Sequence, residues 1–332
     1  MAAIGRRMAE VMSRILHRLD MVQRRHRVLG FPWAVFRKYS DDDGPRLAAQ
    51  LTYYGFLSVF PLLLLATAAV TELLRGQPEW RSLVLDRLVR PQLRPGVEQA
   101  LADLPSSGVP FAVGLVGLLF SGTGGVLAVY FAVNKMWGVA WRDRFGLVSR
   151  WTRVLLVLAL SFVTGVLAAG STVVTDTVLR LPAVQRGAGG IATGVAVFAV
   201  IVVVHKVLVC RPVRLGDMWV GGAVAATTVT ALLHTAATVL PALITRAGLV
   251  YGSFATVVGV FTLLYLMSQA LVLGVEISTV AAEGLSPRGL TDAELTAMDQ
   301  RALVLLARRQ ERVPGQHVTT SFAADPGRTY DL

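Results

Sequence analysis

Six apolar segments, each about 20 residues or longer, decide what this chain can fold into. They lie at about 51–71, 109–132, 152–175, 190–210, 217–240 and 250–282. About 20 apolar residues in a helix cross the roughly 30 Å hydrocarbon core of a bilayer. The composition agrees, because 54% of the residues are hydrophobic and only 16% are charged. We therefore expect an all-α, polytopic membrane protein with a bundle of six transmembrane helices over residues 47–284.

The basic residues alternate between the connections that join these segments. One set of connections holds 24 of the 32 Lys and Arg residues, at 1–50, 133–153, 206–216 and 283–332. The other set holds eight, at 72–108, 176–189 and 241–249. Such a bias is typical of cytoplasmic loops, so we expect a cytoplasmic-membrane protein with both termini in the cytoplasm. A nucleic-acid surface would gather its basic residues on one folded face, so the net charge of +11 does not indicate that partner.

The two ends of the chain are more polar than the middle. Residues 1–46 form a basic segment in which apolar residues recur at helical spacing opposite the arginines, at Ile4, Met8, Val11, Met12, Ile15, Leu19 and Val22. This pattern predicts an amphipathic surface helix that binds anionic lipids, and a solvated basic tail is the alternative. Residues 285–332 predict a cytoplasmic tail, with a short helix from a capping box at Thr291 to about Glu311 and disorder beyond Pro314.

Polar residues within the first span share one helical face. Gln50, Tyr54, Ser58 and Pro61 follow one another at spacings of 4, 4 and 3. Pro61 has no N–H and is expected to kink the helix. A polar face at membrane depth either contacts another helix or lines a ligand site, and the spacing leaves both open. In the second span, small residues at three- or four-residue spacing predict close approach of a neighbouring helix, at Gly114, Gly117, Ser121, Gly124 and Gly125.

The last span carries a similar face. Tyr265, Gln269 and Glu276 are spaced by 4 and 7, and Glu276 is the one acidic residue well inside an apolar run. It is expected either to pair with a basic residue such as Lys135 or Arg211, or to take part in moving a proton or substrate.

The fifth span adds His234 beside a stripe of threonines. The five histidines of the chain form no HxxxH or HxH spacing, and there is no P-loop, GxSxG or CxxC motif. We therefore expect no enzyme activity, no metal site and no cofactor.

Four stretches together resemble a known family of bacterial inner-membrane proteins. They are AAQLTYYGFLSVFPLLLL at 48–65, FAVNKMWGV at 131–139, RPVRLGDMWVGGAVAA at 211–226 and YGSFATVVGVFTLLYLMSQALVLGVEIS at 251–278. The family is YihY / virulence factor BrkB, and the resemblance implies six transmembrane helices with cytoplasmic ends. Carried over by position, its characteristic residues are Tyr53, Tyr54, Ser58, Pro61, Asn134, Gly222, Tyr251, Gly252, Gly274 and Glu276. The chain departs from the family at 221, where glycine stands in a stretch that often has Pro-Gly.

The polar faces favour transport or translocation of a lipid or other envelope-related substrate through a polar-lined cavity. The candidate residues for such a pathway are Gln50, Tyr53, Tyr54, Ser58, Pro61, Asn134, His234, Tyr265, Gln269 and Glu276. The alternative is a membrane scaffold for envelope assembly, in which the same residues only join helices. A homo-oligomer is compatible with either function. A cavity bordered by Tyr54, Ser58, Gln269 and Glu276 would favour transport.

Overall fold

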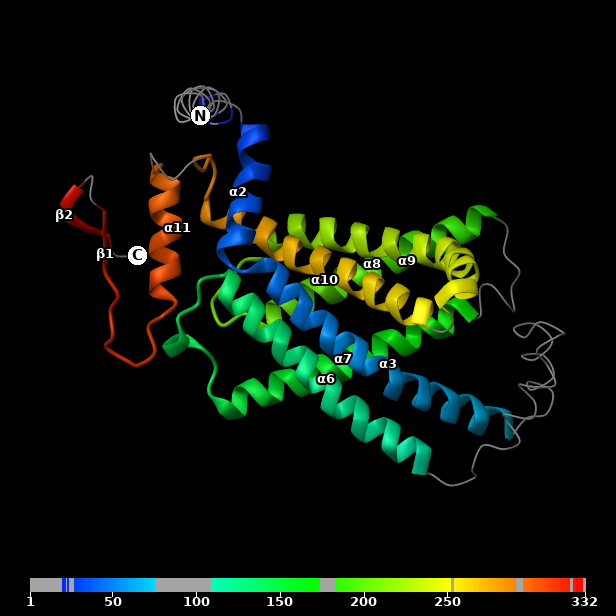
Figure 1. Cartoon of the computed structure of the whole chain (residues 1–332). Helices are drawn as coiled ribbons and strands as arrows, with labels where there is room; N and C mark the ends of the chain where they lie inside the picture. Colours follow the sequence, from blue (N-terminus) through cyan, green and yellow to red (C-terminus); the bar gives the residue numbers. More distant parts are fainter. Residues whose placement is uncertain are drawn as a thin grey trace.

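A computed structural model describes most of the chain, and Figure 1 shows its course. The described residues are 20, 21, 23, 27–75, 109–173, 183–251, 254–290, 295–322 and 325–330. Eight α-helices lie within these ranges. The expectation of an all-α bundle is confirmed for this part of the chain, apart from one short β-hairpin.

Six of these helices are long, and the six predicted segments fall largely on them. They are α3 (Gly44–Arg75), α6 (Val109–Met136), α7 (Leu147–Val173), α8 (Ala183–Leu208), α9 (Leu215–Tyr251) and α10 (Phe254–Glu283). The shortest has 26 residues, a rise of about 39 Å, which exceeds the hydrocarbon thickness of a bilayer. Helix α9 also continues through the predicted connection at 241–249.

Three stretches among the described residues are both long and apolar enough to cross a membrane, Phe111–Met136, Leu215–Ala236 and Phe254–Glu283. Large apolar side chains are also exposed on the outer faces, such as Phe120 (74% exposed) and Ile191 (72%). Apolar surface of this extent needs a bilayer rather than water around it. The chain is therefore a membrane protein, while the count of six spans stays a prediction.

Helix α10 lies in the middle of the bundle, beside α9 on one side and α3 on the other (Figure 1). The contact with α9 depends on two glycines, because a Cβ atom at Gly221 would lie 1.9 Å from the backbone oxygen of Gly274. A Cβ atom at Gly274 would in turn lie 2.7 Å from the Cβ of Ala225. Backbones approach this closely only where side chains are absent.

The two ends of the described chain meet at one end of the bundle, which we call the α2/α11 end (Figure 1). Helix α2 (Arg27–Asp41) turns into α3 at residues 42–43, and α11 (Ala297–Arg308) returns to it. Their shared apolar core consists of Ala34, Val35, Val280, Leu285, Ala302 and Leu305. The short helix η2 (Trp141–Asp143) follows α6. Docking of α11 on α2 and α10 thus makes the tail part of the fold.

The tail differs from its prediction in two places. The helix begins with a capping box of Thr296 and Asp299, whereas the box predicted at Thr291 lies outside the described residues. Beyond Pro314, where the sequence indicates disorder, β1 (Thr320–Phe322) pairs antiparallel with β2 (Asp325–Tyr330). A two-stranded hairpin is marginal alone, and its weak apolar pattern explains why the sequence does not predict it. The predicted surface helix at residues 4–22 lies almost wholly outside the described residues.

Candidate functional site

The polar face of α3 contacts another helix. The hydroxyl of Ser58 lies 3.1 Å from that of Ser121 on α6. The ring of Tyr54 fills the space above Gly124, and Pro61 packs on Gly117, where a Cβ atom would lie 3.0 Å from its ring. The predicted glycine ridge of α6 is therefore confirmed, and its neighbour is α3.

The remaining candidates of this region lie apart from that contact. Gln50 and Tyr53 are exposed on α3. On α10, the amide of Gln269 donates to the hydroxyl of Tyr265 at 2.6 Å and accepts a hydrogen bond from the hydroxyl of Tyr39 on α2. Gln269 thus connects α10 with α2, whereas Tyr54 and Ser58 face α6.

Glu276 is fully buried, and its partner differs from the predicted ones. Its Oε2 lies 3.4 Å from Nζ of Lys38 on α2. Lys135 pairs instead with Asp43 at 2.8 Å, and Arg211 pairs with Glu283 at 2.7 Å. The prediction of Lys135 or Arg211 as partner is therefore wrong, because the packing of α2 against α10 brings Lys38 closer.

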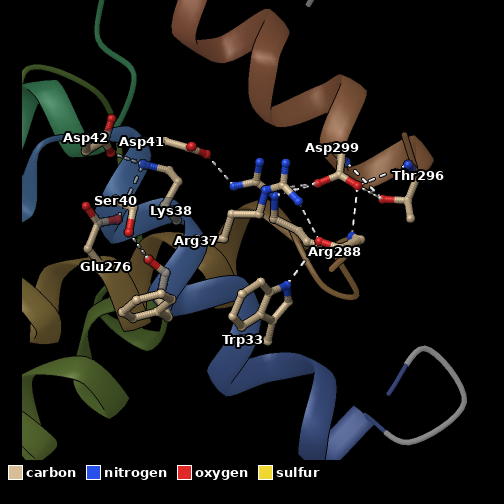
Figure 2. A network of polar contacts seen from close by, with 12 residues as sticks. Trp33, Arg37, Lys38, Ser40, Asp41, Asp42, Glu276, Arg288, Thr296 and Asp299 are labelled. Atoms are coloured by element: carbon tan, nitrogen blue, oxygen red, sulfur yellow. Dashed lines mark hydrogen bonds and ion pairs between the residues drawn. The ribbon is translucent and has the colours of Figure 1, made fainter. Parts of the chain in front are cut away.

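Lys38 is the centre of a buried charge cluster that Figure 2 shows. Its ammonium donates to the carboxylate of Asp42 and, at 2.8 Å, to the carbonyl of Met136 on α6. Asp42 also pairs with Arg309, just after α11. Burial alone would lower the pKa of Lys38, but the attraction of Glu276 and Asp42 outweighs burial and raises it. Lys38 therefore stays charged.

A second buried cluster holds the tail to α2 (Figure 2). Arg288 pairs with Asp299 of α11 at 2.9 Å and with Asp41 of α2 at 2.6 Å. Burial alone would raise the pKa of Asp299, but hydrogen bonds from Thr296, Gly289 and Arg288 outweigh it and lower the pKa. Asp299 is therefore ionised at neutral pH, as the pairing with Arg288 requires.

Sequence reasoning did not select the residues of these clusters other than Glu276. Lys38 and Asp42 are four residues apart, a spacing that places opposite charges on one helical face and so offered a signal. Arg288 and Asp299 offered none, because their meeting depends on how the tail folds back.

Asn134 uses its amide to join two elements. Its Nδ2 donates to the carbonyls of Tyr130 and Leu208, at 2.8 and 2.9 Å, and its Oδ1 accepts from the N–H of Cys210 at 2.8 Å. One hydrogen bond thus stays within α6, and the other two bind backbone at Leu208 and Cys210 at the end of α8, which gives Asn134 a structural task.

His234 borders a cavity of about 520 Å³ between α8 and α9. The walls are mostly apolar, with Phe198, Val195 and Ile191 from α8. Thr230 also lines it, and its buried hydroxyl has no hydrogen-bond partner among the described residues. Ile191 and Val195 are exposed, so the cavity opens on the outer surface of the two helices. In the described part of the chain, no cluster of His, Cys, Asp or Glu could hold a metal ion.

Comparison with known proteins supports the resemblance in the sequence. The family model described as virulence factor BrkB matches residues 35–297. The matched region begins in α2, covers all six long helices and ends at the start of α11. Comparisons with curated proteins and with solved structures each found no match. Because the family model matches well over half of the chain, the chain belongs to the virulence factor BrkB family of membrane proteins.

Proposed function

We propose that the protein translocates a lipid or other envelope-related amphiphile across the bacterial cytoplasmic membrane. In this proposal the chain crosses the membrane six times, both of its ends face the cytoplasm, and it has no enzymatic activity. The cavity between α8 and α9 is the observation that carries the proposal. Apolar walls suit an acyl chain, while Thr230 and His234 offer polar groups to a headgroup or linker.

The cavity supports a pathway at α8 and α9 rather than between α3 and α10. Tyr54 and Ser58 contact α6, and Gln269 and Glu276 contact α2. Thr230 supports the new location because a buried hydroxyl without a partner costs free energy unless a ligand or water satisfies it.

The test is a lipid-flipping assay with fluorescent phospholipids in proteoliposomes. We expect the wild-type protein to accelerate flipping above protein-free liposomes. Thr230→Trp fills the cavity and should slow flipping at least about tenfold, which corresponds to about 1.4 kcal/mol in the barrier. Thr228→Trp is the matched control, because Thr228 lies on the same helix, is exposed and does not line the cavity.

A scaffold for envelope assembly is the second candidate. The polar contacts that join helices favour it, notably Ser58 with Ser121 and Gln269 with Tyr39. A wild-type protein that flips no tested lipid faster than protein-free liposomes would refute translocation and leave the scaffold. Equal slowing by Thr228→Trp and Thr230→Trp would refute the α8–α9 pathway.

A further inference from the structure

A second cavity, of about 540 Å³, lies at the α2/α11 end and is lined by arginines. The loop before α9 supplies Arg211, and α11 supplies Arg301 and Arg308. The end of α10 adds the carboxylate of Glu283. Trp137 and Leu305 add apolar wall. None of these residues lines the cavity between α8 and α9.

Positive charge exceeds negative charge around this cavity. Two guanidinium groups share the single carboxylate of Glu283, with Arg211 at 2.7 Å and Arg301 at 3.7 Å. The other carboxylate of the lining, Asp143, also lies 3.5 Å from Arg142. The lining therefore holds three arginines and two carboxylates, and one of these carboxylates, Asp143, is also paired with an arginine outside the lining.

Arg211 and Arg301 differ in how firmly they are held. Arg211 donates to the carbonyl of Trp137 at 3.2 Å and lies 5.4 Å from the centre of its ring, so its guanidinium is fixed in place. The 3.7 Å between Arg301 and Glu283 exceeds hydrogen-bond distance, and 43% of the Arg301 side chain is exposed. Arg301 can therefore turn its donors toward a ligand.

We propose that this cavity binds a phosphate-bearing anion, with Arg211 and Arg301 as its principal ligands. A guanidinium offers paired donors that match two phosphate oxygens, and two such groups on separate elements can hold one phosphate between them. The phosphate is either that of a lipid headgroup or that of a soluble compound. The site does not depend on whether the protein translocates lipid.

The experiment measures phosphate binding by the full chain in neutral detergent. Native mass spectrometry counts phosphatidylglycerol retained by the protein, with phosphatidylcholine for comparison, and calorimetry follows titration with inorganic phosphate. We expect Arg301→Gln to weaken binding at least about tenfold, since the variant loses the charge-assisted hydrogen bonds to the phosphate. Arg46→Gln is the matched control, because Arg46 is 80% exposed at its side chain and does not line the cavity.

Each outcome decides a different point. Binding of phosphatidylglycerol that inorganic phosphate does not displace identifies a lipid headgroup, and binding of inorganic phosphate identifies a soluble source. Either supports the site if Arg301→Gln weakens it and Arg46→Gln does not. The proposed site would be overturned if Arg301→Gln and Arg46→Gln weakened binding equally, or if Arg301→Gln left both binding and melting temperature unchanged. It would also be overturned if the protein retained the two lipids equally and bound no inorganic phosphate.

Discussion

Lys38 joins three helices: its ammonium lies on α2, pairs with Glu276 of α10 and donates a hydrogen bond to the Met136 carbonyl of α6. Its ammonium has three N–H donors, and it has three acceptors: Asp42, the Met136 carbonyl and Glu276. A buried ammonium is costly unless it is paired and hydrogen-bonded. With Arg309 on Asp42, the cluster holds two cations and two carboxyl groups. Loss of one member would leave an uncompensated charge at a buried position.

Single and double variants of this pair should therefore differ in stability. Lys38→Met leaves two buried carboxyl groups with one cation, and Glu276→Leu leaves two cations with one carboxylate, so each should lower the free energy of unfolding by about 3–5 kcal/mol. The double variant retains the pair of Asp42 and Arg309, so it should be less destabilised than either single variant. Thermal unfolding in detergent measures this coupling.

An ion pair at the surface provides the control for this comparison of single and double variants. Arg46 and Asp43 are an exposed ion pair at 3.7 Å, and the coupling between Arg46→Met and Asp43→Leu should be small. Additive losses at Lys38 and Glu276 would contradict the buried ion pair. If the double variant also retains lipid flipping, Glu276 is a structural residue and not part of a pathway.

The sequence predicted the importance of Glu276 but not its surroundings. A carboxylate inside an apolar run has to find a cation, and this much follows from the sequence alone. Its choice among cations depends on how α2 lies across the bundle, and no local pattern encodes that packing. Asp299 is a similar case, because it caps α11 and binds Arg288 only after the tail has folded back.

Among the elements, α9 and α10 depend on a close contact between their backbones. The structure gives Gly221, the first residue of the Gly-Gly pair at 221 and 222, a packing role. Its Cα faces the backbone of Gly274, and the hydroxyl of Ser278 lies 2.3 Å from a Cβ placed there. Neither the backbone nor the short serine can move away without separating the helices.

Gly221→Ala should therefore destabilise the protein although alanine is the better helix former. The added methyl group has to push α10 away, and such overpacking should lower the free energy of unfolding by about 1–3 kcal/mol. Gly216→Ala is the matched control on the same helix, since nothing lies within 4 Å of its Cβ position. That variant should be neutral or stabilising by up to about 1 kcal/mol. Equal melting temperatures for the two variants would contradict the close contact.

Helix α11 is held to α2 by Asp299, and its docking should depend on pH. The pKa of Asp299 is lowered in the folded chain, so its contribution is present above the ordinary value of about 3.9 and is lost as the pH falls through the lowered value. Amide hydrogen exchange in α11 should be slow and pH-independent, after correction for intrinsic rates, from pH 7 to about pH 5. Protection should fall below about pH 4.

Asp299→Asn tests whether that carboxylate is responsible. The variant should show weak protection of α11 throughout this range, since Arg288 then lacks one of its two carboxylates. Asp217→Asn is a suitable control, because Asp217 lies at the start of α9 and its carboxylate accepts a hydrogen bond from the exposed backbone N–H of Arg214. If Asp299→Asn lost protection at low pH in the same way as the wild type, titration of other groups would be responsible for that loss.

Sequence patterns thus predict elements better than the contacts between them. The apolar runs located the long helices, and small residues predicted the ridge at Gly117 and Gly124 that α3 covers. The sequence offers two threonine-acid patterns before α11, and the one at Thr291 lies outside the described residues. The one at Thr296 forms the cap because Asp299 also binds Arg288 and Gly289, which only the folded tail provides.

For the molecule as a whole, the contact between α2 and α11 restricts the topology. Asp41 pairs with Arg288, and Asp42 pairs with Arg309, so the start and end of the described chain lie on one side of the bundle. A chain that begins and ends on one side of a membrane crosses it an even number of times. An even number of crossings is therefore our expectation, although three stretches satisfy the apolar criterion, and six long helices fit that expectation.

Cysteine labelling can test both the even count and the direction. In a Cys210→Ser background, which removes the single cysteine, Gly146→Cys and His317→Cys lie at the α2/α11 end, where Arg142 contacts Gln316. Ser106→Cys lies in the predicted outer connection 72–108. Because basic residues favour the cytoplasm, a membrane-impermeant maleimide should label only Ser106→Cys in intact spheroplasts and only the other two in inverted vesicles. Labelling of Gly146→Cys and His317→Cys from opposite sides would contradict an even number of crossings over α7 to α10. Labelling of all three from one side would show that α6 does not cross.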